Sequence, residues 1–394
     1  MLFKLLLLLF PVISVKIKKS FWAANLAQEI EEFLLFTVVT GFKMNNFLTK
    51  TLHNILRRNE TKLHILNYLF WECTWRCNLT CQHCGSDCKS SSSFLDMPFE
   101  DFLNAIQSLK KQYPKNSILV AIMGGEPLVR KDLAECGKVL RENGFRWGIV
   151  TNGFAYDEAM HAKLISAGMG AITVSLDGLE ENHNWLRNHP QSFERAVKAL
   201  ELIISYPRLN YDVVTCVHPK NFTELPDLKE FLISKKIKNW RIFTIAPIGR
   251  ATENSEMILS NEQTRQLMEF IAESRQNDPR INLYFSCESY VGDYEKKVRD
   301  SYFFCHAGIN IASVLIDGSI SACPNIDRAF AQGNIYNDNL LEIWENRFEV
   351  MRNRNWCKTG ICKNCKDFKY CNGGAMHLWN AQQDSIMSCI AAKL

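Results

Sequence analysis

Short apolar runs alternate with longer amphipathic segments from residue 65 to residue 275. The runs have the length and the β-branched and aromatic content of strands, whereas the segments between them repeat apolar residues at helical spacing. Nearly continuous apolar strands that alternate with helices are typical of a parallel sheet covered by helices. Because βα crossovers are right-handed, we expect an open or closed α/β barrel. The expected strands are residues 65–71, 118–123, 147–151, 171–176, 211–217 and 240–245, and the expected helices are residues 99–112, 131–143, 157–167, 192–206, 225–235 and 261–275.

Three cysteines, Cys77, Cys81 and Cys84, follow the first apolar run at the spacing Cys-x₃-Cys-x₂-Cys. Thiolates this close cannot pair sensibly as disulfides, but they can hold three irons of a cubane cluster and leave the fourth iron open. A zinc knuckle or buried free thiols are the alternatives. The chain has 15 cysteines, an odd number, and it is long enough to fold without disulfides. The cysteines therefore indicate metal chemistry in a reducing compartment.

Glycines and polar residues recur where the expected strands end, which is the edge that carries the active site in barrels. They are Gly124, Gly125 and Glu126 after the second run, Asn152 after the third, Ser175 at the end of the fourth, Arg187 on the next connection, and Gly249 and Arg250 after the sixth. Paired glycines let the amine of a ligand approach backbone carbonyls, although a tight turn would also need them. An arginine binds a carboxylate through two parallel hydrogen bonds.

The cysteine loop and these strand ends together resemble radical S-adenosylmethionine (SAM) enzymes, over about residues 63 to 250. The resemblance implies a partial (β/α)6 TIM-type barrel and a [4Fe–4S] cluster on Cys77, Cys81 and Cys84 whose open iron is chelated by SAM. It implies reductive cleavage of SAM to a 5′-deoxyadenosyl radical, which abstracts hydrogen from a substrate. The implied SAM contacts are His83, Gly124, Gly125, Glu126, Asn152, Ser175 and Arg187.

A second group of cysteines near the C-terminus resembles the SPASM domain, which carries auxiliary iron–sulfur clusters, over about residues 300 to 394. An Asp-Gly turn at residues 316–320 predicts a hairpin that brings Cys305 and Cys323 together. Ala375 stands where the family pattern has a further cysteine, so this first auxiliary cluster lacks a ligand unless Cys357 substitutes. The implied ligands of the other auxiliary cluster are Cys362, Cys365, Cys371 and Cys389, for which a zinc ribbon is the alternative.

The resemblance implies a peptide or protein side chain as the substrate, because SPASM enzymes mostly modify peptides. A small molecule or tetrapyrrole precursor is the first alternative, and a non-catalytic iron–sulfur or zinc protein is the second. The segments 83–86 and 373–375 also resemble, in general style, lipoprotein-associated radical SAM/SPASM enzymes. A reductant such as flavodoxin or ferredoxin is the implied electron donor. The net charge of +4 comes without a concentrated basic stripe, so no nucleic-acid partner is expected.

Three regions are expected: an extension at residues 1–62, the barrel at residues 63–285, and a linker with the SPASM domain at residues 286–394. Residues 1–15 have the apolar character of a signal segment but lack a clear cleavage site and are too short to span a bilayer. Export would expose oxygen-sensitive clusters to an oxidising compartment. We therefore expect a cytoplasmic protein that starts at Met44, and membrane association only if residues 1–43 are genuine.

Overall fold

The computed structural model describes residues 46–92, 94–286, 288–382 and 385–394. The predictions on residues 1–43 and on Met44 lie outside these residues. In the described part of the chain, no helix is both long enough and apolar enough to cross a bilayer.

A ten-stranded sheet organises the molecule, in the order β10-β9-β8-β1-β2-β3-β4-β5-β6-β7. Strands β1 to β7 are parallel, in sequence order. They are β1 (Tyr68–Thr74), β2 (Leu119–Gly124), β3 (Arg146–Thr151), β4 (Ala171–Ser175), β5 (Asn210–Val217), β6 (Asn239–Thr244) and β7 (Asn282–Phe285). The six predicted strands are therefore present close to their expected ranges. The four-residue β7 was not predicted.

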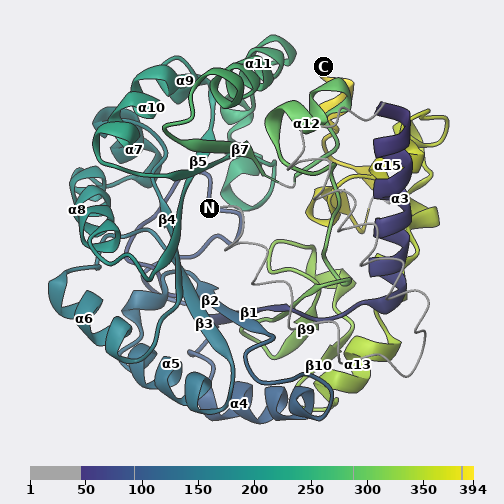
Figure 1. The fold of residues 1–394 in the computed structure, drawn as a ribbon. Helices are drawn as coiled ribbons and strands as arrows, with labels where there is room; N and C mark the ends of the chain where they lie inside the picture. Colours follow the sequence, from purple (N-terminus) through teal and green to yellow (C-terminus); the bar gives the residue numbers. More distant parts are fainter. Residues whose placement is uncertain (1–45, 93, 287, 383–384) are drawn as a thin grey trace.

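Helices cover the outer face of the curved sheet (Figure 1). In the barrel they are α4 (Phe99–Gln107), α5 (Leu133–Glu142), α6 (Glu158–Ser166), α7 (Glu180–Arg187), α8 (Ser192–Ile204), α9 (Pro219–Phe222), α10 (Leu225–Ser234), α11 (Asn261–Asn277) and α12 (Glu295–Val298). The predicted α/β partial barrel is confirmed. Helix α7, which was not predicted, carries Arg187 at its last position.

Alternate residues of each strand face the helices and form the main core. Trp71 of β1 is fully buried and stacks on Phe102 of α4, with ring centroids 4.6 Å apart. Trp147 of β3 packs so closely on α5 that a Cβ at Gly137 would lie 2.2 Å from its ring. Such tight packing fixes the strands against their helices and leaves little freedom at the strand ends.

The other face of the strands encloses a polar interior. Asp212 of β5 and Arg241 of β6 form an ion pair of 2.7 Å, and the Thr173 hydroxyl of β4 donates to Asp212 at 2.6 Å. Tyr68 of β1 interacts electrostatically with both charges, although β1 is next to neither strand in the sheet. Burial raises the pKa of Tyr68 to about 12. Contacts between strands that are not neighbours require the sheet to curve around an interior, as a barrel does.

The C-terminal region extends the sheet beyond β1. Strand β8 (Ile311–Val314) pairs with β1 in parallel, and β9 (Ser319–Ser321) and β10 (Gly333–Asn334) follow as antiparallel strands. The predicted hairpin at residues 316–320 is therefore confirmed. The remaining elements are α13 (Leu340–Asn346), α14 (Glu349–Arg352), α15 (Phe368–Cys371) and the short pair β11 (Trp379–Asn380) and β12 (Ser385–Ile386).

A buried carboxylate ties this hairpin to the barrel. Glu72 of β1 accepts hydrogen bonds from the backbone of Ile316 and from the Arg328 guanidinium, both at 2.9 Å. Arg328 also pairs with Asp317 in the hairpin turn at 3.0 Å. Because an unpaired buried carboxylate is costly, this network holds the C-terminal hairpin in one register against β1.

Helix α3 (Asn46–Leu63) lies along the C-terminal region, beside α15, on the side of the ring away from α6 (Figure 1). Arg57 donates to the backbone carbonyls of Tyr370 at 2.7 Å and Lys369 at 2.9 Å, and Trp344 donates to the carbonyl of His64 at 3.0 Å. The first and last parts of the described chain are thereby joined.

Candidate functional site

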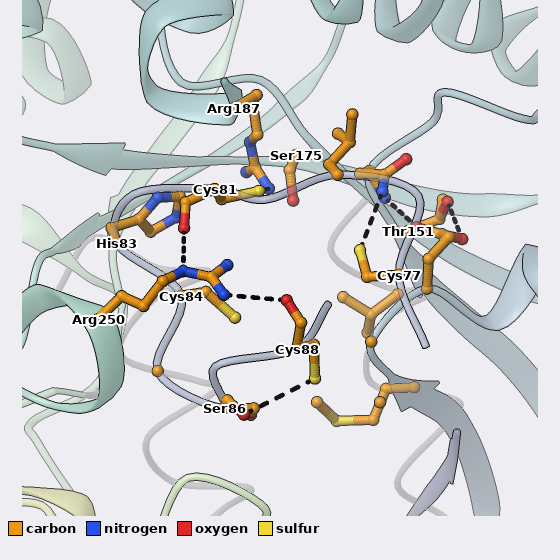
Figure 2. A pocket seen from close by; sticks show the side chains of 18 residues that line it. Cys77, Cys81, His83, Cys84, Ser86, Cys88, Thr151, Ser175, Arg187 and Arg250 are labelled. Atoms are coloured by element: carbon orange, nitrogen blue, oxygen red, sulfur yellow. Dashed lines mark hydrogen bonds between the residues drawn. The ribbon is translucent and has the colours of Figure 1, made fainter. Parts of the chain in front are cut away.

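A closed loop at the carboxyl end of β1 carries the clustered cysteines. The Cys77 amide donates to the Lys89 carbonyl at 2.8 Å, so the two ends of the loop meet. Arg250 crosses the loop and donates to the carbonyls of Cys81 at 2.7 Å and Cys88 at 3.0 Å (Figure 2). Arg250 was singled out in the sequence for its place after the sixth strand, and its role as a clamp on this loop was not predicted.

The loop lines a cavity of about 200 Å³ at the carboxyl edge of the sheet. The predicted ligands of the SAM-binding cluster and the predicted SAM contacts all line it: Cys77, Cys81, His83, Cys84, Gly124, Gly125, Glu126, Asn152, Ser175 and Arg187. The structure thus brings together residues at or just after the ends of β1, β2, β3 and β4 and at the end of α7, which lie up to 110 residues apart in the sequence. Cys88 lines the same cavity as a fourth thiol (Figure 2).

The paired glycines are required by the backbone itself. A Cβ at Gly124 would lie 2.1 Å from the Thr74 carbonyl oxygen, and one at Gly125 would lie 2.2 Å from that of Arg76. Gly124 also has a φ of 141°, which favours glycine. Close approach of the ends of β1 and β2 therefore explains this pair, beside the contact with a ligand amine that the sequence suggested.

Glu126 holds the end of β3 in place. Its carboxylate accepts hydrogen bonds from the Thr151 hydroxyl and the Asn152 amide, both at 2.8 Å, and from the Leu128 amide at 3.1 Å. Burial raises the pKa of Glu126 to about 7. The Asn152 side chain in turn donates to Asn78 at 2.8 Å, inside the cysteine loop. Glu126 lines the cavity, yet its oxygens are engaged by the protein, which makes it a positioning residue in this geometry.

Arg187 and Asp177 form a buried ion pair at the wall of the cavity beside Cys81. Arg187 Nε donates to Asp177 Oδ2 at 2.6 Å, and a terminal nitrogen reaches Cys81 Sγ at 3.6 Å. Burial alone would raise the pKa of Asp177, but Arg187, His83, His183 and the Cys216 amide together outweigh burial and hold that pKa well below its usual range. The Cys216 amide donates to the other Asp177 oxygen at 2.9 Å. Asp177 therefore orients the guanidinium that faces the cavity.

His83 points to the same wall. Ligand atoms of His83, Asp177 and Cys216 all lie within 4.8 Å of one another. Burial lowers the pKa of His83 to about 3, so its ring is neutral at physiological pH. Cys216 of β5 is half-buried and lies at this edge of the site.

The thiols of the loop differ in their acidity. Burial raises the pKa of Cys77 to about 12 and also raises that of Cys81. A hydrogen bond between the Cys84 and Cys88 side chains lowers the pKa of Cys84 to about 6. Deprotonation of buried thiols such as Cys77 becomes favourable when a cation binds, which couples metal loading to proton release.

The second cysteine group is formed mainly by four thiols that influence one another electrostatically: Cys362, Cys365, Cys371 and Cys389. Burial raises the pKa of Cys362 to about 11 and of Cys371 to about 12. Cys357 lies against Gly373 and accepts a hydrogen bond from Arg354 at 3.2 Å.

Cys305 and Cys323 have different surroundings. Cys305 lines a small cavity with Cys371, and Cys323 interacts electrostatically with Tyr68 in the barrel interior. Ala375 is buried in the apolar cluster against which Cys305 packs. The assignment of Cys305, Cys323 and Cys357 to one cluster stays a prediction.

Comparison with known proteins is consistent with this geometry. Residues 71–232 match the Radical SAM superfamily, and residues 305–366 match SPASM, an iron–sulfur cluster-binding domain. This chain is a radical SAM protein with a SPASM domain.

Its relatives act on different substrates. The chain is similar to Fe-coproporphyrin III synthase from Methanosarcina barkeri, with 25% identity over 351 residues, which cover 80% of this chain and 87% of the relative. It is similar to the mycofactocin maturase MftC from Mycolicibacterium smegmatis, with 26% identity over 313 residues, 78% of this chain and 77% of the relative.

The fold is similar to that of SuiB from Streptococcus suis bound to its precursor peptide SuiA. The TM-score is 0.62 at 16% identity, over 91% of this chain and 88% of SuiB. SuiB has also been solved with SAM bound.

The cofactors of this radical SAM/SPASM protein are iron–sulfur clusters and SAM, and the cavity fits them. Its loop presents several thiols, the soft donors that iron–sulfur clusters require. The Arg187 guanidinium, which lines the same cavity, suits a carboxylate. Residues whose roles the sequence did not reveal, Asp177, Arg250 and Cys88, act through contacts between distant segments, for which the sequence has no local pattern.

Proposed function

We propose that this radical SAM enzyme modifies a side chain of a peptide or protein. The observation that supports the radical chemistry is that Cys77, Cys81 and Cys84 line one cavity together with the paired glycines and Arg187. When bound, the cluster and SAM supply a 5′-deoxyadenosyl radical that removes hydrogen from carbon. In this proposal the three cysteines hold the cluster.

The chain's own residues orient SAM and exclude water. Arg187, held by Asp177, is placed to bind the SAM carboxylate, and the backbone of Gly124 and Gly125 to accept from its amine. Glu126 and Asn152 keep the end of β3 against the cysteine loop through their hydrogen bonds. His83 and Ser175 complete the SAM contacts. Holding reactants in one geometry supplies a large share of the rate enhancement in enzymes.

The charges of the barrel interior favour a peptide over a tetrapyrrole. Tetrapyrrole precursors carry several propionates, so a site for them needs cations that are available to bind carboxylates. Arg241 is paired with Asp212, and Arg328 is paired with Glu72 and Asp317. SuiB, whose fold this chain shares, binds a precursor peptide.

The four neighbouring thiols of the C-terminal region support one auxiliary cluster on Cys362, Cys365, Cys371 and Cys389. Such a cluster, with a reductant such as flavodoxin or ferredoxin, provides a path for the electron that the reaction takes up or releases. A small-molecule or tetrapyrrole substrate is the second candidate, because the chain is similar to Fe-coproporphyrin III synthase over 80% of its length.

Anaerobic incubation with SAM and dithionite tests the proposal. We expect 5′-deoxyadenosine from the wild type and none from Cys81→Ala, whose buried thiol is a proposed cluster ligand. Addition of peptides encoded beside the gene, in parallel with a tetrapyrrole precursor of Fe-coproporphyrin III, separates the two substrate classes by the mass of the product. Deoxyadenosine formation by Cys81→Ala would refute the radical SAM assignment, and conversion of the tetrapyrrole precursor alone would refute the peptide.

A further inference from the structure

Cys88 is a fourth thiol in the cysteine loop, at the continued spacing Cys-x₃-Cys-x₂-Cys-x₃-Cys. It lines the same cavity as Cys77, Cys81 and Cys84 and is 3% exposed (Figure 2). A [4Fe–4S] cluster is usually held by four cysteine thiolates. The loop therefore contains the full number of thiols for such a cluster, although three suffice for an enzyme that binds SAM at the fourth iron.

The backbone of Cys88 is fixed, and its sulfur is directed at Cys84, a proposed cluster ligand. Its carbonyl accepts from Arg250 at 3.0 Å, and the next residue closes the loop through the bond from Cys77 to Lys89. The sulfur contacts the Ser86 carbonyl at 3.8 Å and the Cys84 side chain. On this anchored backbone the sulfur can change partners by rotation about the side-chain bond.

Two other buried cysteines show that burial alone does not place a thiol at this cavity. Cys73 and Cys136 are at most 1% exposed, and both belong to the main core between strands and helices. Cys88 instead belongs to a separate apolar cluster with Cys77 and Cys81. Its position in the loop that carries the proposed ligands is thus specific.

We propose that Cys88 ligates the fourth iron of the cluster while SAM is absent and leaves it when SAM binds. The inference rests on the proposed cluster at Cys77, Cys81 and Cys84. In the exchange, the iron–sulfur bond to Cys88 breaks, the released thiolate takes up the proton that the SAM ammonium loses, and the resulting amine and the carboxylate of SAM bind the iron. No electron is transferred. The cluster is thereby closed to oxidants until the co-substrate is present.

Anaerobically reconstituted wild type, Cys88→Ala and the control Cys136→Ala test this exchange. Ferricyanide oxidation removes an iron that lacks a thiolate and leaves a [3Fe–4S]⁺ cluster with a sharp electron paramagnetic resonance signal. Without SAM, we expect this signal to be strong in Cys88→Ala and weak in wild type and in Cys136→Ala. SAM should suppress it in Cys88→Ala. Equal signals in all three proteins would overturn the proposal.

Equilibrium binding of SAM gives a second measure. If Cys88 occupies the fourth iron in half of the molecules, the apparent Kd of SAM doubles. Cys88→Ala should therefore bind SAM at least about twofold more tightly than wild type. Unchanged or weaker binding would contradict the exchange. If Cys88 instead donated hydrogen to a substrate radical, the variant would lose product while cluster oxidation and SAM affinity stayed as in wild type, and this outcome also excludes the proposal.

Mössbauer spectroscopy of the ⁵⁷Fe wild type keeps the proposal testable if Cys88→Ala does not fold. All four irons of the cluster at Cys77, Cys81 and Cys84 should have thiolate-like isomer shifts before SAM is added, as those of the auxiliary cluster do, and one should shift afterwards. A distinct iron before SAM would refute the role of Cys88. Equal iron and sulfide contents in wild type and in Cys77→Ala would instead contradict the proposed cluster itself, which separates the two failures.

Discussion

Replacement of Asp177 by asparagine should destabilise the protein strongly, because it leaves the Arg187 charge buried without its partner. Asp177 is fully buried and Arg187 is 8% exposed, and their atoms are 2.6 Å apart. Removal of one member of such a pair costs roughly 3–5 kcal/mol of the free energy of unfolding. The asparagine can still accept from the Cys216 amide, so the loss reports the charge rather than that hydrogen bond.

The double variant Asp177→Asn/Arg187→Met removes both charges at similar volume. We expect it to regain most of the lost stability, since replacement of both members of a buried pair is often nearly neutral. Binding of SAM should stay weak in both variants, because Arg187 is misplaced in one and absent in the other. The double variant should therefore recover the stability of the wild type without recovering its affinity for SAM.

Urea unfolding followed by tryptophan fluorescence measures the stability, and equilibrium dialysis measures SAM binding. Glu194→Gln is the matched control, because it removes an exposed pair with Lys198 and should change neither quantity. The reasoning is refuted if Asp177→Asn unfolds at the wild-type urea concentration, or if the double variant is less stable than Asp177→Asn.

Three further predictions follow from single contacts. Arg250→Lys should retain less iron per chain than wild type, because lysine cannot bond the carbonyls of Cys81 and Cys88 together; equal iron content after gel filtration would contradict the clamp. Gly137→Ala should lower the free energy of unfolding by about 1–3 kcal/mol through overpacking against Trp147, with Gly170→Ala as a neutral control, and chemical denaturation will decide. Glu288 accepts hydrogen bonds from the backbone amide and the hydroxyl of Thr244 at the end of β6, and burial raises its pKa from 4.5 to about 7, so the folded state binds the Glu288 proton more tightly. This stabilisation is complete below pH 4.5 and is lost as the pH rises through 7, so Glu288→Gln should flatten the dependence of the free energy of unfolding on pH over that range.

The strands and the cysteine loop were predictable because their signals are local. Each apolar run has the period and length of a strand, and Cys77, Cys81 and Cys84 lie within eight consecutive residues. Strand β7 has four residues, which is too short to establish a period. The pairing of β8 with β1 joins segments about 240 residues apart, and the sequence has no pattern for such a contact.

The candidate site was predictable in its members more than in their roles. Glu126 was expected as a SAM contact, and the structure engages its oxygens with the backbone and side chains at the end of β3. Gly124 and Gly125 were explained by a ligand, and the nearby carbonyls of Thr74 and Arg76 require them as well. These differences share one cause: a close approach between strands depends on tertiary geometry, which residue identity alone does not specify.

The contact between α3 and the C-terminal region determines the order in which these parts of the chain can fold during synthesis. Arg57 bonds the carbonyl of Tyr370, 313 residues later in the chain. At ribosomal rates of 5–20 residues per second, roughly 15–60 s pass between the synthesis of the two. During this time α3 lacks the surface that covers it, while the barrel between them can already fold. The helix that is made early is therefore docked last, and the newly made chain depends on protection of that helix until its final residues emerge.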